Sequence, residues 1–239
     1  MCGRFVSSRR PEDLAPLFGA RWDGEAVPPS WNVAPTDPVY AVLERPAKHG
    51  PGADRQVRVV RWGLVPSWSK DPGGGARMIN ARVETVDTKP AFRKAFTSRR
   101  CLLPADGYFE WVTAEVPGGK PRKQPYYLTP SDESLMAMAG LYEFWRDRNV
   151  PEDDPAGWLT TCTIITTDAK DAAGRVHDRM PLTVAAGAYD DWLDPAHQDP
   201  GSLRALLVPP AGGNLEVREV STEVNSVRNN GAQLIAPAA

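Results

Sequence analysis

Short β-forming runs separated by short, turn-rich connections constrain this fold more than any other feature of the sequence. The 239 residues include 20 Gly and 24 Pro, so turns are frequent and elements are short. Residues 159–167 are nearly all β-formers and predict the clearest strand. Because most connections are too short for a crossover helix, neighbouring strands should pair antiparallel. The pattern predicts an α+β fold.

The same sequence pattern predicts the domain boundary and the positions of the strands, helices and loops. No internal repeat or composition break marks a boundary, so we expect one domain over residues 1–231 and a loose tail over 232–239. Strands are expected at 39–43, 57–62, 100–104, 107–112, 126–129, 136–145, 159–167 and 215–220, with an extended piece at 78–82. Short helices are expected at 12–19, 89–96, 169–176, 189–193 and 203–207, and loops or turns at 31–36, 46–55, 71–75, 115–125 and 147–157.

Charge and cysteine usage exclude several classes of protein. A formal net charge of -2 gives no global field for nucleic acid, so any anion site must be a local patch. Three widely spaced cysteines form no disulfide framework, and with three histidines they predict no structural metal and no cofactor. This usage suits a reducing cytoplasm. No apolar run predicts a signal peptide or a membrane span. We expect a cytoplasmic monomer.

Cys2 is the residue with the most unusual reactivity. If Met1 is removed, Cys2 carries a free α-amine beside its thiol. The amine can condense with an aldehyde to an imine, and the thiol can close a five-membered ring on the imine carbon. The thiol alone could attack an ester or amide. The alternative is an ordinary small residue at a mobile terminus, which position alone favours.

Two other side chains are candidates for acid/base work. Glu110 lies between Phe109 and Trp111 on an expected strand, and an apolar niche there would raise its pKa. Strand alternation favours a solvated outer face instead, for Glu110 and equally for Glu143. His177 follows a strand and a turn, and its neighbours Asp178 and Arg179 could orient it or bind a phosphate. The alternative is a surface or structural histidine.

Residues 77–101 are locally basic, with seven Lys or Arg against two acidic residues. Trp62 and Trp68 precede this interval. Basic residues interleaved with aromatic ones are typical of a surface that binds single-stranded nucleic acid. A solvated helix face would account for the charge equally well.

Ordered blocks along the chain carry a resemblance to a known family. They are Met-Cys-Gly-Arg-Phe at 1–5, Asn-x-Ala-Pro-Thr at 32–36, Trp-Gly-Leu-x-Pro-x-Trp at 62–68, Asn-Ala-Arg-x-Glu-Thr at 80–85, Phe-Arg at 92–93, Arg-Cys-Leu-x-Pro-x-x-Gly-x-Phe-Glu-Trp at 100–111, Ala-Gly-Leu-Tyr-Glu-x-Trp at 139–145, Thr-x-x-Ala at 166–169, His-Asp-Arg-Met-Pro at 177–181 and Ser-Thr-x-Val-Asn at 221–225. Together they resemble the SOS-response-associated peptidase (SRAP) family, the abasic-site processing proteins. The Gly-rich 73–75 and acidic 147–157 stretches depart from the pattern.

The resemblance implies a fold and a function. The fold would be a single domain with a mostly antiparallel, barrel-like sheet, short flanking helices and a DNA-binding cleft. The chain would trap abasic sites in single-stranded DNA through Cys2, first as an imine and then as a thiazolidine, and so protect the lesion during the DNA damage response. Met1 would leave first, through either the protein's own peptidase activity or a housekeeping aminopeptidase, and weak lyase activity could accompany the imine. In a bacterium the protein would be associated with the nucleoid.

The resemblance also implies residue roles. Asn80 would orient the Cys2 amine or the sugar, Glu110 would be the general acid/base, and His177 would assist near the sugar and phosphate. Phosphates would be bound by Arg4, Arg82 and Arg93, while Pro35 and Trp68 would pack against bases and wedge the duplex end.

Three other functions remain open at this stage. An N-terminal-nucleophile hydrolase such as a glutamine amidotransferase can begin with the same residues but needs an ammonia-accepting domain. A cysteine peptidase acting on other proteins could pair Cys2 with His177. A passive DNA-binding protein would make Cys2 incidental.

Overall fold

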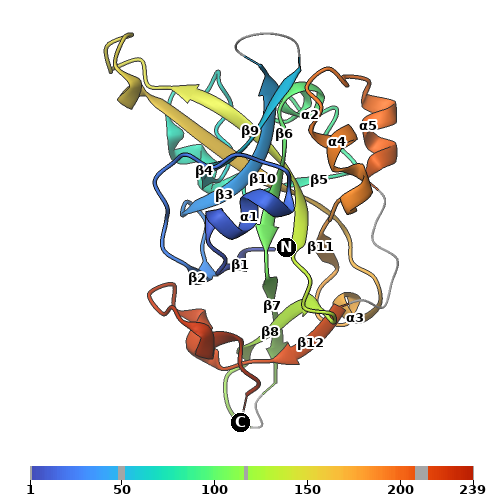
Figure 1. Cartoon of the computed structure of the whole chain (residues 1–239). Coiled ribbons are helices and arrows are strands. Elements are labelled where there is room, and N and C mark those ends of the chain that lie inside the picture. The colour runs from blue at the N-terminus through green and yellow to red at the C-terminus, as the bar shows by residue number, and fades with distance from the viewer. Residues whose placement is uncertain (1, 48–51, 116–117, 208–214, 239) are drawn as a thin grey trace.

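A computed structural model describes residues 2–47, 52–115, 118–207 and 215–238 (Figure 1). Met1 and residues 48–51 of the expected hairpin loop lie outside this range. The strands are β1 (Arg4–Ser7), β2 (Ser30–Val33), β3 (Pro38–Pro46), β4 (Ala53–Trp62), β5 (Asn80–Arg82), β6 (Arg100–Ala105), β7 (Gly107–Ala114), β8 (Arg122–Pro130), β9 (Met136–Arg146), β10 (Trp158–Asp168), β11 (Arg179–Pro181) and β12 (Leu215–Glu219). The helices are α1 (Pro11–Leu17), α2 (Arg93–Ser98), α3 (Asp171–Gly174), α4 (Tyr189–Leu193) and α5 (Pro200–Leu206), with 3₁₀ turns η1 (Pro72–Arg77), η2 (Pro155–Gly157), η3 (Ala186–Ala188), η4 (Thr222–Asn225) and η5 (Ala232–Ile235).

Five strands close into a barrel in the order β10-β4-β3-β6-β9, because β9 pairs back onto β10. The β3–β4, β3–β6, β6–β9 and β9–β10 pairs are antiparallel. The β4–β10 pair is parallel, as is the pair that adds β5 to β10. The predicted α+β fold with a mostly antiparallel, barrel-like sheet is confirmed, and the parallel pairs are additions to it.

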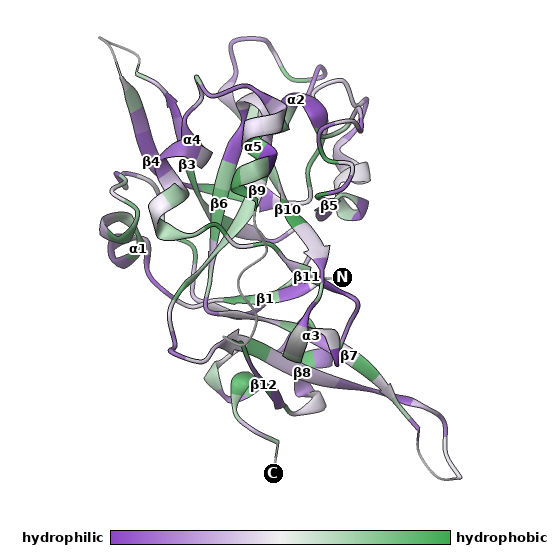
Figure 2. Cartoon of the chain, turned by 90° about the vertical axis from the view of Figure 1, so that its right-hand side faces the viewer, coloured by the Kyte–Doolittle hydropathy of each residue, from purple (hydrophilic) through white to green (hydrophobic). Residues whose placement is uncertain are grey.

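Successive side chains along each barrel strand point alternately into two cores, because side chains in a strand leave opposite faces in turn. Along β3, Val39, Ala41 and Leu43 join one buried cluster with residues from the other four barrel strands. Tyr40 and Val42 point the other way, into a cluster that contains residues of α1, α2, α4 and α5. Figure 2 shows hydrophobic residues along β6, β9 and β10, whereas β4 also carries hydrophilic residues. The first cluster therefore fills the barrel and the helices cover its outer face.

A second sheet lies below the barrel in Figure 1, with the order β12-β8-β7-β1-β2 and antiparallel pairs throughout. The first half of its strand β7, from Gly107 to Glu110, is buried on both faces. Tyr108 packs into the barrel cluster, whereas Phe109 packs into a third cluster with Val224 and Leu234. A Cβ at Gly107 would lie 2.5 Å from the Tyr127 ring, so only glycine lets β7 start this close to β8.

The structure corrects several sequence-based expectations. Residues 30–33 form β2 rather than an irregular turn, because they pair with β1. Residues 72–77 form η1, capped by the Asp71 side chain, where a flexible loop was expected. Strand β8 begins at Arg122, inside the expected 115–125 loop. Helix α2 begins only at Arg93. In the described part of the chain, no helix has both the length and the apolar character needed to cross a membrane.

The expected loose tail from residue 232 is wrong over its described residues. Leu234 is fully buried in the cluster beneath β7. Pro237 forms a β-bridge with Val220, and the Ala238 N–H donates to the Glu219 carbonyl over 2.9 Å. Apolar contacts with residues distant in sequence hold this segment, so local composition did not reveal it.

Candidate active site

Cys2 lies two residues before β1 and is fully buried against the residues that fill the barrel. The Asn80 side chain, on β5, donates a hydrogen bond of 2.8 Å from Nδ2 to the Cys2 carbonyl. Burial, reinforced by the negative charge of Glu110, raises the pKa of the Cys2 thiol. The thiol is therefore protonated at neutral pH, and a base must accept its proton when it reacts.

Glu110 is buried and does not lie on a solvated face. It is 3% exposed, in the part of β7 whose two faces are both covered. Burial raises the pKa of Glu110 to about 7. Near neutral pH the protonated and ionised forms are thus both populated, as acid/base catalysis requires.

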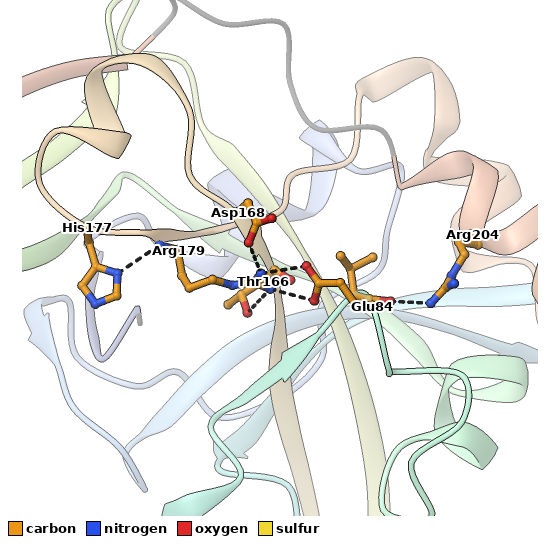
Figure 3. A network of polar contacts seen from close by, with 7 residues as sticks. Glu84, Thr166, Asp168, His177, Arg179 and Arg204 are labelled. Atoms are coloured by element: carbon orange, nitrogen blue, oxygen red, sulfur yellow. Dashed lines mark hydrogen bonds and ion pairs between the residues drawn. The ribbon is translucent and has the colours of Figure 1, made fainter.

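His177 precedes β11, and its ring is oriented by the backbone (Figure 3). The Arg179 N–H donates to His177 Nδ1 over 3.0 Å, and Asp178 Oδ1 lies 2.6 Å from the same nitrogen. One nitrogen cannot accept the first bond and donate the second together. The Asp178 carboxylate is 83% exposed and can rotate away, whereas the backbone N–H is fixed. Burial lowers the pKa of His177, which favours the neutral ring. Because Nδ1 accepts the bond from the Arg179 N–H, the ring proton lies on Nε2.

The Arg179 side chain anchors this segment. It is buried, and its guanidinium bonds Glu84 at 2.7 Å, Asp168 at 2.5 Å and the Thr166 carbonyl at 2.7 Å. Figure 3 shows Arg179 between His177 and Glu84. Because its guanidinium is paired with Glu84 and Asp168, the Arg179 side chain is not available to bind phosphate. It joins the start of β11 to β10 and to the turn after β5.

A cavity of about 620 Å³ opens at this place, lined by Gly3, Arg4, Glu110, Trp111, Lys123, His177 and Asn225. Arg4 is held in the wall by three bonds from its guanidinium, to Asn32 Oδ1 at 2.7 Å, to the Val224 carbonyl at 2.9 Å and to the Asn225 carbonyl at 3.4 Å. It also lies 5.7 Å from the centre of the Trp111 ring. Two cations, Arg4 and Lys123, therefore line one cavity with Glu110 and His177, next to Cys2.

The remaining predicted DNA-binding residues lie outside the cavity wall. Arg82 is exposed and is two residues from Asn80 on β5, so both side chains leave the same face of that strand. Arg93 is exposed at the start of α2. Trp68 is 63% exposed. Pro35 precedes Thr36, whose N–H donates to the Trp62 carbonyl, so it lies beside the end of β4.

Other residues with suggested surface roles are internal. Trp62 is fully buried and packs edge-on against Phe5 at 5.0 Å, so it offers no stacking surface. Arg100 is buried and caps carbonyls that include Trp192 at 2.7 Å. Arg99 pairs at 2.8 Å with Glu143, which is buried and not solvated. The basic interval thus reaches solvent at fewer positions than its composition suggested.

Sequence reasoning missed part of the wall. Trp111 donates from its indole nitrogen to Asn225 Oδ1 over 2.6 Å, and Asn225 and Lys123 join it in lining the cavity. Trp111 and Asn225 each end one of the blocks that carry the family resemblance, and that signal could have found them. Lys123, within an expected loop, gave no such signal.

Comparison with known proteins decides the family. The family model described as SOS response associated peptidase (SRAP) matches residues 1–227. The chain belongs to the SRAP family. The abasic site processing protein YoqW of Bacillus subtilis is 38% identical over 238 residues, which cover 98% of this chain and 99% of YoqW. The abasic site processing protein YedK of Escherichia coli is 31% identical over 247 residues, covering 99% and 100%.

A crystal structure of a protein from Bacteroides thetaiotaomicron shares the SRAP fold of this chain. It is 24% identical, covers 100% of both chains and superimposes with a TM-score of 0.80. At that identity the likeness establishes the fold alone. The site chemistry must be argued from the residues of this chain.

Proposed function

We propose that this SRAP protein processes abasic sites in single-stranded DNA by forming a covalent bond through Cys2, and so protects the lesion during the DNA damage response. The observation that carries the proposal is the buried Glu110, with a pKa raised to about 7, beside Cys2 in the wall of a cavity that also receives Arg4 and His177. The names of its relatives agree with this substrate.

The first chemical step joins the sugar to the Cys2 amine. Once Met1 has left, an α-amine with a pKa of about 8 is partly neutral at pH 7 and can attack the open-chain aldehyde of an abasic deoxyribose. Protonated Glu110 gives a proton to the departing hydroxyl, which leaves as water. The hydrogen bond from Asn80 to the Cys2 carbonyl fixes the backbone next to the amine, so the two reactants meet in one orientation.

The second step closes the ring. Ionised Glu110 accepts the thiol proton and delivers it to the imine nitrogen while sulfur bonds to the imine carbon. The product is a thiazolidine. Neutral His177, on the cavity rim with its proton on Nε2, can donate to the sugar ring oxygen or to a phosphate as the sugar opens.

The DNA itself would be held by charge and stacking. Arg82 and Arg93 are exposed cations, so their guanidinium groups can contact DNA phosphates directly. Arg4 would meet the phosphate nearest the sugar from the cavity wall. Trp68 offers its exposed indole to a base, with Pro35 completing the wedge.

The same groups can account for the peptidase part of the family description. A thiol next to the Met1–Cys2 bond, with Glu110 as base, can release Met1 before DNA is bound. An imine at C1′ also allows β-elimination of the 3′ phosphate, which gives weak lyase activity. A Glu110→Gln chain that keeps Met1 when the aminopeptidases of the host are absent would support self-removal, and a chain that loses it there would refute it.

The test compares tagged chains on an abasic single-stranded oligonucleotide. A C-terminally tagged chain should give an adduct that resists SDS, whereas Cys2→Ala or an uncleaved N-terminal tag should give none. Equal crosslinking by the N-terminally tagged chain would refute the proposal. Turnover of a peptide or of glutamine without any DNA adduct would favour the hydrolase, and binding without any adduct would favour a passive DNA-binding protein.

A further inference from the structure

Tyr108 is a fully buried residue whose hydroxyl has no hydrogen-bond partner among the described residues. It lies on β7 opposite Phe5, and its ring packs in the same cluster as Cys2. A buried hydroxyl without a partner costs stability, and a phenylalanine would fill the same space without that cost. Such a group at a reactive site points to a role outside the resting fold.

The neighbours of Tyr108 define what its hydroxyl can do. Two ionisable groups act on it electrostatically, the Cys2 thiol and the Glu110 carboxyl. Burial, and then these two groups, raise the pKa of Tyr108 well above its usual range, so the hydroxyl keeps its proton even when Glu110 is ionised. It is therefore a hydrogen-bond donor at every pH at which the protein works.

The Cys2 sulfur needs such a donor only when it reacts. In the resting arrangement the thiol itself lies 3.9 Å from the Arg4 carbonyl, to which it can only donate. That contact opposes negative charge on the sulfur. During attack the thiol gives up its proton in a fully buried place, where charge is poorly stabilised.

We propose that the Tyr108 hydroxyl donates a hydrogen bond to the Cys2 sulfur as the sulfur attacks the imine carbon, and so accelerates ring closure. The inference rests on the proposed function above. In this step the carbon–sulfur bond forms, the π-bond of the imine breaks and its electron pair moves to nitrogen. The thiol proton passes through Glu110 to that nitrogen, so nothing is oxidised or reduced. A bond made only in the transition state raises the rate of the step without strengthening the resting state.

The experiment separates the two chemical steps in Tyr108→Phe. The full chain, with removal of Met1 checked by mass, is mixed with an abasic single-stranded oligonucleotide and stopped at intervals with or without borohydride. Borohydride fixes the imine by reduction, whereas the ring survives denaturation without it. We expect imine formation at the wild-type rate and ring closure slower by about 10- to 100-fold, the loss expected for one hydrogen bond to a charged group.

Tyr127→Phe is the matched control, because it removes another buried phenol from the neighbouring strand β8, within the cluster on the opposite face of the sheet. It should leave the ratio of imine to ring unchanged. Tyr108→Phe should also unfold at a temperature no lower than the wild type, since it removes an unpartnered hydroxyl.

Three results would overturn the inference alone. These are ring closure at the wild-type rate, a clear loss of stability in Tyr108→Phe, and an equal slowing of both steps with a shifted pH midpoint for imine formation. The last would mean that the hydroxyl serves Glu110 and not the sulfur. Absence of any adduct with the wild-type chain would instead overturn the proposed function, and the inference with it.

Discussion

Replacing Glu110 with glutamine should slow crosslinking and stabilise the protein at the same time. The carboxyl is almost completely buried and its pKa is raised from 4.5 to about 7. Removing a general acid/base of this kind should lower the rate of adduct formation about 10²–10⁴-fold. Affinity for abasic DNA should change little, because Glu110 carries no phosphate contact in the proposed mechanism.

The stability effect has a definite sign and pH window. The folded state holds the Glu110 proton more tightly than the unfolded state, so its contribution to stability is complete below pH 4.5 and is lost as pH rises through 7. The shift from 4.5 to about 7 corresponds to a cost on the order of 3 kcal/mol once Glu110 is ionised. Glu110→Gln avoids this cost and should raise the Tm at pH 8 by up to about 6–12 °C. At pH 4.5 the two proteins should unfold at nearly the same temperature.

Calorimetry from pH 4.5 to 8, beside single-turnover crosslinking, measures both effects. Glu143→Gln is the control, since it changes another buried glutamate but leaves Arg99 without its ion pair. It should lower the free energy of unfolding by about 1–3 kcal/mol. A Glu110→Gln chain that crosslinks normally, or that is less stable than the wild type at pH 8, would refute the reasoning about the niche.

Four other substitutions test the proposed DNA-binding surface and the residues that support it. Arg82→Ala or Arg93→Ala should each weaken binding to single-stranded DNA and reduce the slope of log K against log salt by about 0.7, and an unchanged slope would remove that residue from the phosphate contacts. Trp68→Ala should cost about 1–3 kcal/mol of binding with no change in Tm, because the indole is 63% exposed; binding equal to the wild type would exclude stacking there. Arg179→Met should remove the hydrogen bonds to Glu84, Asp168 and the Thr166 carbonyl, lower the free energy of unfolding by about 1–3 kcal/mol and slow the steps that use His177. A stable Arg179→Met chain with normal crosslinking would contradict the anchoring role.

Local pattern was enough to predict most strands of this fold. Val39 to Leu43 and residues 159–167 have β-formers and flanking turns, and both lie within barrel strands. The antiparallel majority followed from connection length. The parallel pairs of β10 with β4 and β5 could not be predicted, because pairing between strands so distant in sequence depends on how the barrel closes.

The environments of polar residues were harder to predict. Strand alternation favoured solvated positions for Glu110 and Glu143, yet both are buried, because each strand is covered on two faces. Composition also could not distinguish Arg100, which caps buried carbonyls, from exposed Arg93 a few residues earlier. The resemblance supplied the candidate site residues. In the structure Glu110 and His177 line one cavity, and Asn80 bonds the carbonyl of Cys2, which lies next to the cavity residue Gly3.

The central claim is that Cys2 reacts as a free N-terminal residue, and intact mass spectrometry tests it most directly. The purified chain is weighed before and after incubation with an abasic single-stranded oligonucleotide. Before incubation the mass should correspond to a chain without Met1. Afterwards a new species should have the summed mass of protein and oligonucleotide less one water, because imine formation releases water and ring closure releases nothing. An adduct on a chain that still carries Met1, or no adduct on a chain that has lost it, would contradict the account.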